Sequence, residues 1–434
     1  MPERFFVETL GCPKNEVDSE KLTGSLLAAG LEPATTLTDA DLVVVNTCAF
    51  IEAARAESVA VIMEVARRRR RGARLVVTGC LAARAGEELA EALPEVDAVV
   101  DVGIPVHLRG ARWRPRVERA IPIDFLEAAR PRAQAPWAYV KVAEGCDRRC
   151  GFCAIPQFRG PQRSRRKDAI LAEVDRLGVA EVVLVAQDLA SYGRDLGHSD
   201  ALVGLVEAVA ERVARVRLLY LYPSALDVRL IETIVATRVP YFDLSLQHVA
   251  RPVLRRMRRF GSGDVFLDRI DKIRALAPEA ALRSSFILGY PGETEDDHDA
   301  LLDFLKAAEL DWAGFFAYSE EDGTYAAGLG DKTPPALALE RLRECAGLQD
   351  AITARRRRAL VGVTTEVLID EVGVGRSHRE APEIDGVIHV PRGGVPGSLR
   401  RVRIEAAVGT DLEGCFVDAG SAGRRREAHA VARA

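Results

Sequence analysis

Short apolar runs alternate with longer stretches rich in Ala, Glu and Arg along two parts of the chain, and this alternation limits the possible folds most. The runs of the first part are residues 5–7, 42–45 and 75–77, and those of the second part are residues 138–143, 181–186, 217–221, 241–246, 282–288 and 313–318. Strand and helix patterns that alternate in this way are typical of parallel βα units. We therefore expect an α/β protein, with an N-terminal parallel α/β domain followed by a central partial (βα)6 barrel. The active site should lie where the barrel strands end.

The chain of 434 residues suggests about three domains at ~150 residues each. The residue pattern changes at two points, which mark the expected boundaries. Residues 113–136 are irregular and contain five Arg and four Pro, as a linker does. From Thr364 onward, short strand patterns alternate with Gly-rich turns, which is typical of a small β-barrel. These strands are expected at residues 366–372, 386–390, 399–408 and 414–417. We predict domains at 1–125, 132–360 and 364–432.

Composition excludes several classes of protein. The 60 Lys and Arg against 64 Asp and Glu give a net charge of -4, so the chain as a whole does not attract nucleic acid. No uncharged apolar run reaches the ~18 residues that a membrane helix needs, and the N-terminus does not follow the plan of a signal peptide. We expect a cytoplasmic enzyme without a membrane partner. Eight Cys in such a chain indicate metal or redox chemistry more than disulfides.

The strongest single motif is Cys146-x3-Cys150-x2-Cys153, which follows the first expected barrel strand. Three thiolates in one loop can hold three irons of a cubane cluster, and no fourth Cys lies nearby to close it. An iron left open can bind a substrate or cofactor, whereas electron-transfer clusters generally have four protein ligands. A structural zinc knuckle is the alternative, but it would require a fourth Cys or a His close by.

A second set of cysteines is dispersed along the chain. Cys12, Cys48 and Cys80 each follow an expected strand of the first domain. In a parallel sheet the carboxyl ends of the strands lie along one edge, so the three thiols can converge. Taken alone, each is more often a small buried hydrophobe than a ligand, but the repeated placement favours a second trio of ligands. Cys345 and Cys415 lack such a context, and we expect both to pack in the core.

The segments around these cysteines resemble radical S-adenosylmethionine (SAM) enzymes of the methylthiotransferase family, and the resemblance covers nearly the whole chain. It is carried by residues 9–20 (TLGCPKNEVDSE), the strand ends at Cys48 and Cys80, residues 144–153 (EGCDRRCGFC), residues 155–165 (IPQFRGPQRSR), 187–188, 246–248 and 286–294. The C-terminal module resembles a TRAM domain. The resemblance implies a radical SAM core at 132–360.

Within the family the chain is most similar to the RimO type, which methylthiolates an aspartate of small-subunit ribosomal protein S-twelve at its β-carbon. The features that carry this are residues 10–15 (LGCPKN), the segment from Arg159 to Arg165, and residues 381–386 (APEIDG). A sibling type acts on a modified adenosine in transfer RNA, and its opening typically has Gln and Met at the positions of Pro13 and Lys14. Residues 364–434 contain 11 acidic and 10 basic residues, which fits a basic ribosomal protein better than RNA phosphates.

The resemblance also implies a mechanism. A [4Fe-4S] cluster on Cys146, Cys150 and Cys153 would bind SAM and cleave it to a 5′-deoxyadenosyl radical. Such a radical can remove the β-hydrogen of an aspartate, which is too weakly acidic for any side-chain base. A second [4Fe-4S] cluster on the dispersed trio would hold the sulfur, and a second SAM would supply the methyl group. The implied partners are ribosomal protein S-twelve, free or in the small subunit, an electron donor such as flavodoxin or ferredoxin, and a sulfur donor.

Several further side chains are candidates for the site. Strand-end positions that could hold SAM are Gln187, Asp188, Gln247, Gly289 and Gly292. The two glycines could equally form a plain βα turn, and the residue types at 187–188 differ from the Gly-Gly-Glu that radical SAM enzymes often carry. Lys14 and Asn15 beside Cys12 are candidates for donors to the cluster sulfurs.

Three functions remain open from the sequence. The first is a methylthiotransferase acting on the ribosomal protein, and the second is a methylthiotransferase acting on transfer RNA. The third is a non-catalytic iron-sulfur protein that binds ribosomes or RNA through its β-barrel, although two clusters that each lack a fourth ligand fit such a role poorly.

Overall fold

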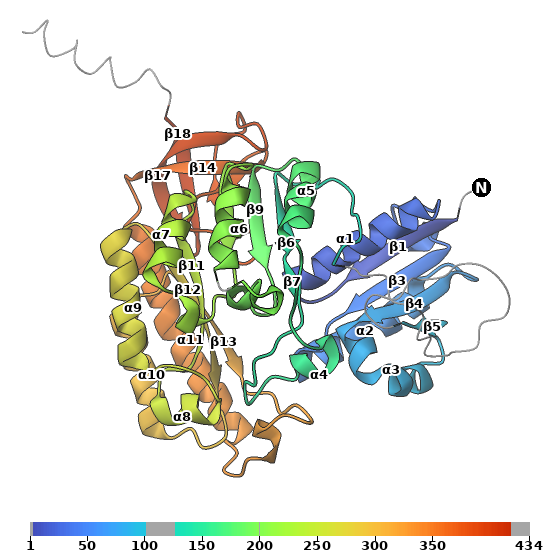
Figure 1. Cartoon of the computed structure of the whole chain (residues 1–434), viewed down its shortest axis with the longest axis horizontal. Coiled ribbons are helices and arrows are strands. Elements are labelled where there is room, and N and C mark those ends of the chain that lie inside the picture. Colours follow the sequence, from blue (N-terminus) through green and yellow to red (C-terminus); the bar gives the residue numbers. More distant parts are fainter. Residues whose placement is uncertain (1–2, 101–125, 199, 418–434) are drawn as a thin grey trace, which may run out of the picture.

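The computed structural model of the protein describes residues 3–100, 126–198 and 200–417. Figure 1 shows three parts in chain order, with the N-terminal sheet in blue, a central array of strands and helices in green to orange, and a small red barrel. The expected α/β architecture is confirmed. The stretches 101–125 and 418–432, which fall within the predicted domains, lie outside the described residues, as does much of the predicted linker.

The N-terminal part is a parallel sheet covered by three helices. Its strands are β1 (Arg4–Thr9), β2 (Glu32–Pro33), β3 (Leu42–Thr47), β4 (Arg74–Gly79) and β5 (Ala98–Val99), in the order β2-β1-β3-β4-β5. The helices are α1 (Pro13–Ala28), α2 (Glu52–Arg68) and α3 (Cys80–Ala92). Strand β3 is buried along its whole length, as expected for a central strand with both faces covered. The very short β2 and β5 gave no signal in the sequence.

The central part contains the six expected barrel strands. They are β6 (Trp137–Lys141), β9 (Glu181–Val185), β10 (Arg215–Leu218), β11 (Tyr241–Gln247), β12 (Ala281–Leu288) and β13 (Trp312–Ala317). Three pair as β6-β9-β10 and three as β11-β12-β13, all in parallel. A parallel bridge between Leu221 and Leu244 joins the two groups, so the six strands form one curved, open array.

Helices pack on the outer face of this array. They are α5 (Lys167–Leu177), α6 (Ala201–Ala210), α7 (Val228–Ala236), α8 (Arg251–Arg256), α9 (Gly263–Leu276), α10 (Glu295–Ala308) and α11 (Pro335–Arg358). The short helix α4 (Ile155–Arg159) packs against α3 of the N-terminal part instead. Strand residues such as Val140 and Leu184 join the helices in the largest apolar cluster, while their neighbours Tyr139 and Val183 line the other face. This alternation follows from the two-residue period of a strand. Among the described residues, no helix is long and apolar enough to cross a membrane.

The open side of the array, between the edge strands β6 and β13, is covered by parts of the chain that lie far apart in sequence. Helix α1 lies against β6 (Figure 1), and its Val17 is buried in the inner cluster. A segment of the C-terminal module spans both edges, because the Tyr139 hydroxyl donates to the Pro382 carbonyl at 3.0 Å and the Trp312 indole donates to the Arg379 carbonyl at 2.7 Å. The N-terminal and C-terminal parts therefore complete the central barrel.

The C-terminal module is a closed five-stranded barrel, as predicted. Its strands are β14 (Thr364–Glu371), β15 (Val374–Arg376), β16 (Ile388–His389), β17 (Leu399–Val408) and β18 (Asp411–Phe416). The sequence did not indicate β15, and it overestimated the length of β16. Helix α11 leads into the module and ends in four arginines, which suit the negative end of the helix dipole.

Candidate functional site

The dispersed cysteines meet at one edge of the N-terminal sheet. Cys12 follows β1 and caps α1, Cys48 directly follows β3, and Cys80 is the first residue of α3 after β4. Gly11 has a φ of +99°, and a Cβ atom there would lie 2.9 Å from the Cys48 sulfur. The thiols are also close enough for Cys12 and Cys80 to act electrostatically on Cys48. The structure thus brings this trio together.

The three thiols of this trio differ in their electrostatics. Burial raises the pKa of the Cys48 thiol to about 11. Burial also raises the pKa of Cys80, against the opposing effect of the Arg159 guanidinium. Burial would raise the pKa of Cys12 as well, but the Lys14 ammonium and the backbone N–H groups of Asn15 and Lys14 outweigh it and lower the pKa. Of the three thiols, only Cys12 is therefore made more acidic by its surroundings.

The predicted donors at Lys14 and Asn15 contact the trio in different ways. The backbone N–H groups of both residues face Cys12, while the Lys14 ammonium lies 3.6 Å from the centre of the Tyr220 ring. The Asn15 side-chain amide donates to the carbonyls of Leu10 and Thr47, both at 2.9 Å. Its oxygen accepts from the Cys80 thiol at 3.6 Å. Asn15 therefore ties together the loops of this trio, and its side chain is an acceptor towards Cys80.

The second trio lies in the loop between β7 (Ala143–Glu144) and β8 (Arg163–Ser164). These two strands form a short antiparallel pair that the sequence did not predict. Gly145 begins the loop with a φ of +76°, and a Cβ atom there would meet the Pro161 carbonyl at 2.1 Å. The Gly151 N–H donates to the Met257 carbonyl at 2.8 Å, and its carbonyl accepts from the Ala326 N–H at 2.7 Å. The loop is thus anchored on two sides against the segments after β11 and β13.

Cys146 is buried and Cys150 and Cys153 are half-buried in this loop, beside hydrogen-bond donors. Burial raises the pKa of Cys146 to about 11 and that of Cys153 to about 12. The Arg148 N–H donates to the Cys146 sulfur at 3.4 Å, and the Arg259 guanidinium donates to the Cys150 sulfur at 3.3 Å. Unpaired thiolates would be costly here, so negative sulfur in this loop needs either these donors or a bound metal.

Both trios fit an iron-sulfur cluster. Each consists of three sulfurs with N–H or guanidinium donors directed at them, which is the environment that cluster sulfurs require. Within the described ranges, no three His, Cys, Asp or Glu side chains are grouped so that they could hold a metal ion. In a cubane each thiolate binds its own iron, so a trio need not converge on one point.

A buried charged network connects the two trios. The Lys141 ammonium pairs with Asp18 of α1 and with Glu144, the latter at 2.6 Å. Arg159 pairs with the same two carboxylates and also donates to the Cys80 sulfur at 3.0 Å. Burial would raise the pKa of Glu144, but Arg159 and Lys141 outweigh it and lower the pKa. The roles of Arg159, Lys141, Asp18 and Glu144 were not predictable from the sequence, because these residues meet only through the fold.

Gln187 and Asp188 lie beside the loop of Cys146. The Gln187 amide donates to Glu144 at 2.5 Å, and Asp188 pairs with Arg148 at 2.6 Å. In the part of the chain that the structure describes, Gln187 Oε1, Asp188 Oδ1 and Gln162 Oε1 are buried and accept no hydrogen bond. Buried acceptors are rarely left without a donor, so these atoms fit the ammonium group of a bound SAM. Gln162 is an addition to the predicted residues.

The Gly289–Gly292 turn lies against Gly151 of the same loop, and Gln247 is the last residue of β11. Gln247 has a φ of +72°, a strained value for this residue type that is common at functional sites. The neighbouring His248 is fully buried, and burial lowers its pKa to about 4. His248 Nε2 lies 3.8 Å from Glu293, which accepts from the Gly289 N–H at 2.7 Å. The strand ends of β11 and β12 are therefore connected.

The two glycines of the turn face protein atoms. A Cβ atom at Gly289 would lie 2.5 Å from that of Ala338 in α11, and one at Gly292 would overlap the Arg256 guanidinium. Tyr290 between them is buried and donates to the Arg256 carbonyl at 3.1 Å, beside Gly151 of the cysteine loop. These contacts explain the glycines through packing of the turn, and any contact with SAM would be through its backbone.

The remaining two cysteines have different environments. Cys345 is fully buried on α11, as predicted. The prediction that Cys415 packs in the core is wrong, because it is half-exposed on β18 beside Glu405. The Cys415 side chain lies on the partly exposed face of β18. The apolar residues beside it in the sequence did not show which face of the strand it occupies.

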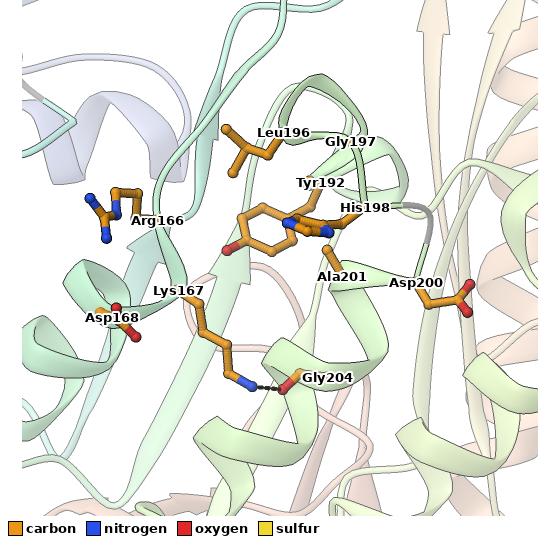
Figure 2. A pocket seen from close by; sticks show the side chains of 11 residues that line it. Arg166, Lys167, Asp168, Tyr192, Leu196, Gly197, His198, Asp200, Ala201 and Gly204 are labelled. Atoms are coloured by element: carbon orange, nitrogen blue, oxygen red, sulfur yellow. Dashed lines mark hydrogen bonds between the residues drawn. The ribbon is translucent and has the colours of Figure 1, made fainter.

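A cavity of about 640 Å³ lies outside the two trios (Figure 2). It is lined by the starts of α5 and α6, with Tyr192 at its centre and Lys167 donating to the Gly204 carbonyl at 2.7 Å. None of the eight cysteines lines it. The cavity is therefore not the place where the predicted chemistry would occur.

Three protein families match successive parts of the chain. They are described as uncharacterized protein family UPF0004 over residues 4–101, the radical SAM superfamily over residues 140–305, and the TRAM domain over residues 361–417. The first contains the dispersed cysteines and the second contains the cysteine loop.

Individual relatives match nearly the whole chain. A ribosomal protein uS12 methylthiotransferase RimO of Koribacter versatilis is 38% identical, over 95% of this chain and 96% of the relative. A protein of the same name from Desulforudis audaxviator is 43% identical, over 94% and 96% of the two chains. Among solved structures, the radical SAM methyltransferase TsrM of Kitasatospora setae is 16% identical, with a TM-score of 0.47 over 75% of this chain and 77% of that one.

Proposed function

This chain belongs to the ribosomal protein uS12 methylthiotransferase (RimO) family, and we propose that it adds a methylthio group to the β-carbon of an aspartate in ribosomal protein S-twelve (uS12). The observation that carries the proposal is the pair of cysteine trios, each with three sulfurs, linked by one buried network of charges. Two sites with three sulfurs each suit a reaction that needs one site to generate a radical and another to deliver sulfur.

We assign Cys146, Cys150 and Cys153 to the SAM-binding [4Fe-4S] cluster, and Cys12, Cys48 and Cys80 to the auxiliary [4Fe-4S] cluster. When bound, the clusters and SAM supply the electron, the hydrogen-abstracting radical, the sulfur and the methyl group. The domains would be 1–125, 132–360 and 364–432, with the auxiliary cluster in the first and SAM in the second.

The protein's own residues orient these groups and exclude water. Gln187, Asp188 and Gln162 would accept hydrogen bonds from the SAM ammonium, since their buried oxygens have no other donor among the described residues. The Arg148 side chain pairs with Asp188, and the Arg148 backbone N–H donates to the Cys146 sulfur. Gln247 and the backbone of Gly289 and Gly292 would border the rest of SAM. Lys14 and Asn15 hold the Cys12 loop in place through their backbone N–H groups.

The partners beyond the substrate are also proposals. Exposed arginines lie on the cysteine loop and on and after α8, namely Arg149, Arg251, Arg255 and Arg258. The segment after α8 meets the loop where Arg259 donates to the Cys150 sulfur and the Met257 carbonyl accepts from the Gly151 N–H. A positive surface beside a buried redox group suits an acidic one-electron carrier such as flavodoxin or ferredoxin. A separate sulfur donor would restore the auxiliary site. Because ribosomal proteins reside in the cytoplasm, the enzyme would act there.

Mass spectrometry of a deletion strain tests the proposed function. Ribosomal protein uS12 from the wild type should be about 46 Da heavier than from the deletion strain, the mass of a methylthio group that replaces hydrogen. Transfer-RNA nucleosides should be identical in the two strains. A change in the nucleosides alone would instead establish the transfer-RNA activity. If reconstituted protein failed to cleave SAM under reducing conditions, only a non-catalytic role would remain.

A further inference from the structure

Arg159 is the side chain that joins the two cysteine sites. It is the last residue of α4, in the loop between β7 and β8 that also carries Cys146, Cys150 and Cys153. Its side chain is 3% exposed. Helix α4 packs against α3, and Phe158 lies against the core of the N-terminal part. The radical SAM part of the chain therefore places a guanidinium inside the N-terminal cysteine site.

The guanidinium makes four hydrogen bonds with separate partners. Nη2 donates to the Cys80 sulfur at 3.0 Å and to the Asn15 side-chain oxygen at 2.9 Å. Nη1 donates to Asp18 at 3.0 Å and to Glu144 at 3.2 Å. Only the planar fork of an arginine can make these contacts together, because a lysine ammonium is a single point of charge. The contact set thus specifies arginine.

One of these partners leads directly to the other site. Glu144 comes two residues before Cys146 and accepts from Gln187 at 2.5 Å and from the Gly145 N–H at 3.3 Å. The path from the Cys80 sulfur to the Cys146 loop consequently passes through one guanidinium that is 3% exposed and one carboxylate that is 13% exposed. A fixed path of this kind sets the distance between the two sites.

The network also places a positive charge on a sulfur of the auxiliary site. Asp18 and Glu144 are balanced by Lys141 and Arg159, so the charges of the network cancel. Of its four members, only Arg159 contacts a cysteine sulfur. A cluster gains negative charge when it is reduced, and a hydrogen bond from a cation to its ligand favours the reduced form.

We propose that Arg159 is a positioning residue that fixes the Cys80 sulfur relative to the Cys146 loop and favours the reduced form of the auxiliary cluster. This inference rests on the proposed function, because it assumes a cluster on Cys12, Cys48 and Cys80. Its consequence is that the radical SAM domain adjusts the redox equilibrium of a cluster whose ligands all belong to another domain.

The test uses the full chain with Cys146→Ala, Cys150→Ala and Cys153→Ala, reconstituted so that only the auxiliary cluster is present. Redox titration followed by electron paramagnetic resonance measures its midpoint potential. Arg159→Met should shift the reduction equilibrium at least tenfold towards the oxidised form, which is a potential lower by about 59 mV for one electron. Arg159→Lys should shift it in the same direction by less.

The matched control is Arg130→Met. Arg130 is 1% exposed and also bridges the two parts, pairing with Glu20 of α1 and with Glu173 of α5 at 3.0 Å, but it contacts none of the cysteines. Its variant should change the reduction equilibrium less than threefold. A potential for Arg159→Met that equals that of Arg130→Met would overturn the proposal. If Arg159→Met fails to fold, Arg159→Lys decides, and an unchanged potential in that variant has the same meaning.

The measurement is independent of the substrate. If the potential shifts but wild-type cells show no modified uS12, the proposed function fails while the role of Arg159 stands. If uS12 is modified but the midpoint potential of Arg159→Met does not change, the role of Arg159 fails while the proposed function stands.

Discussion

The two cysteine sites reach the same composition by opposite means. Cys146, Cys150 and Cys153 lie within eight residues of one loop, next to a surface with several exposed arginines. Cys12, Cys48 and Cys80 come from three strands and are joined by a buried network of charges. The first site is defined by spacing and the second by sheet topology. Under the proposed function, the first site would receive electrons at this surface, whereas the second depends on contacts between distant parts of the chain.

The largest expected effect separates the roles of the two sites. Cys150→Ala should abolish SAM cleavage and, with it, all methylthiolation, because its site would supply the electron. Cys80→Ala should keep SAM cleavage but abolish methylthiolation, because its site would supply the sulfur. Measurement of 5′-deoxyadenosine and of modified uS12 in the same reactions gives both values. Equal loss of SAM cleavage in both variants would contradict the division of labour.

A substitution at the start of the barrel strands, away from both cysteine sites, should lower stability but leave the iron content of both sites unchanged. Glu181 begins β9 and is fully buried among Arg215, Arg217 and Arg376. Glu181→Gln leaves these cations without their carboxylate and should cost about 3–5 kcal/mol of unfolding free energy. Thermal unfolding of the apoprotein measures the loss. The iron content of the folded variant should match that of the wild type. Selective loss of one cluster would contradict the expectation that Glu181 affects stability alone.

The same residue predicts a dependence on pH. Burial would raise the pKa of Glu181, but Arg376, Arg217 and Arg215 outweigh it and hold the pKa well below its usual range. A lowered carboxyl pKa stabilises the fold fully above the unfolded value of about 4.3 and loses that effect as pH falls below it. The stability difference between wild type and Glu181→Gln should therefore be constant near neutral pH and shrink below about pH 4.3. A difference that grows in acid would refute this sign.

Two glycine variants should affect one site each. Gly11→Ala places a methyl group 2.9 Å from the Cys48 sulfur, and Gly145→Ala places one 2.1 Å from the Pro161 carbonyl, both at positive φ. Each should cost about 1–3 kcal/mol of backbone strain. Gly11→Ala should reduce the iron of the auxiliary site alone, and Gly145→Ala that of the SAM site alone. Spectra of the reduced proteins distinguish the two losses.

The smallest effects are expected at the two other cysteines. Cys345→Ala removes a fully buried sulfur and should cost about 1 kcal/mol, whereas Cys415→Ala at a half-exposed position should change stability by less than about 0.5 kcal/mol. Iron content should be unchanged in both. Loss of iron in either variant would show that the trios do not account for all ligands.

Local patterns that repeat along the chain made much of the fold and one cysteine site predictable. The runs that became β1, β3 and β4 are each followed by a cysteine within three residues, so the parallel sheet brings Cys12, Cys48 and Cys80 to one edge. The six barrel strands were predictable for the same reason. The short strands β2, β5 and β15 were missed because two or three residues carry no periodicity.

Contacts between distant segments left no trace in the sequence. Arg159 meets Asp18 and Cys80 only because α4 docks on the N-terminal sheet. The closure of the barrel by the segment between Arg379 and Pro382 depends on hydrogen bonds to both edge strands, which no spacing of residues predicts. Cys415 was misassigned for a related reason, since the face of a strand in a small barrel is decided by its partners.

The most direct test of two separate clusters is a count of iron and sulfide in the anaerobically prepared full chain. The account predicts about eight irons per wild-type chain and about four after replacement of either trio by alanine. A wild-type content of about four irons, or a trio variant that keeps all of them, would contradict it.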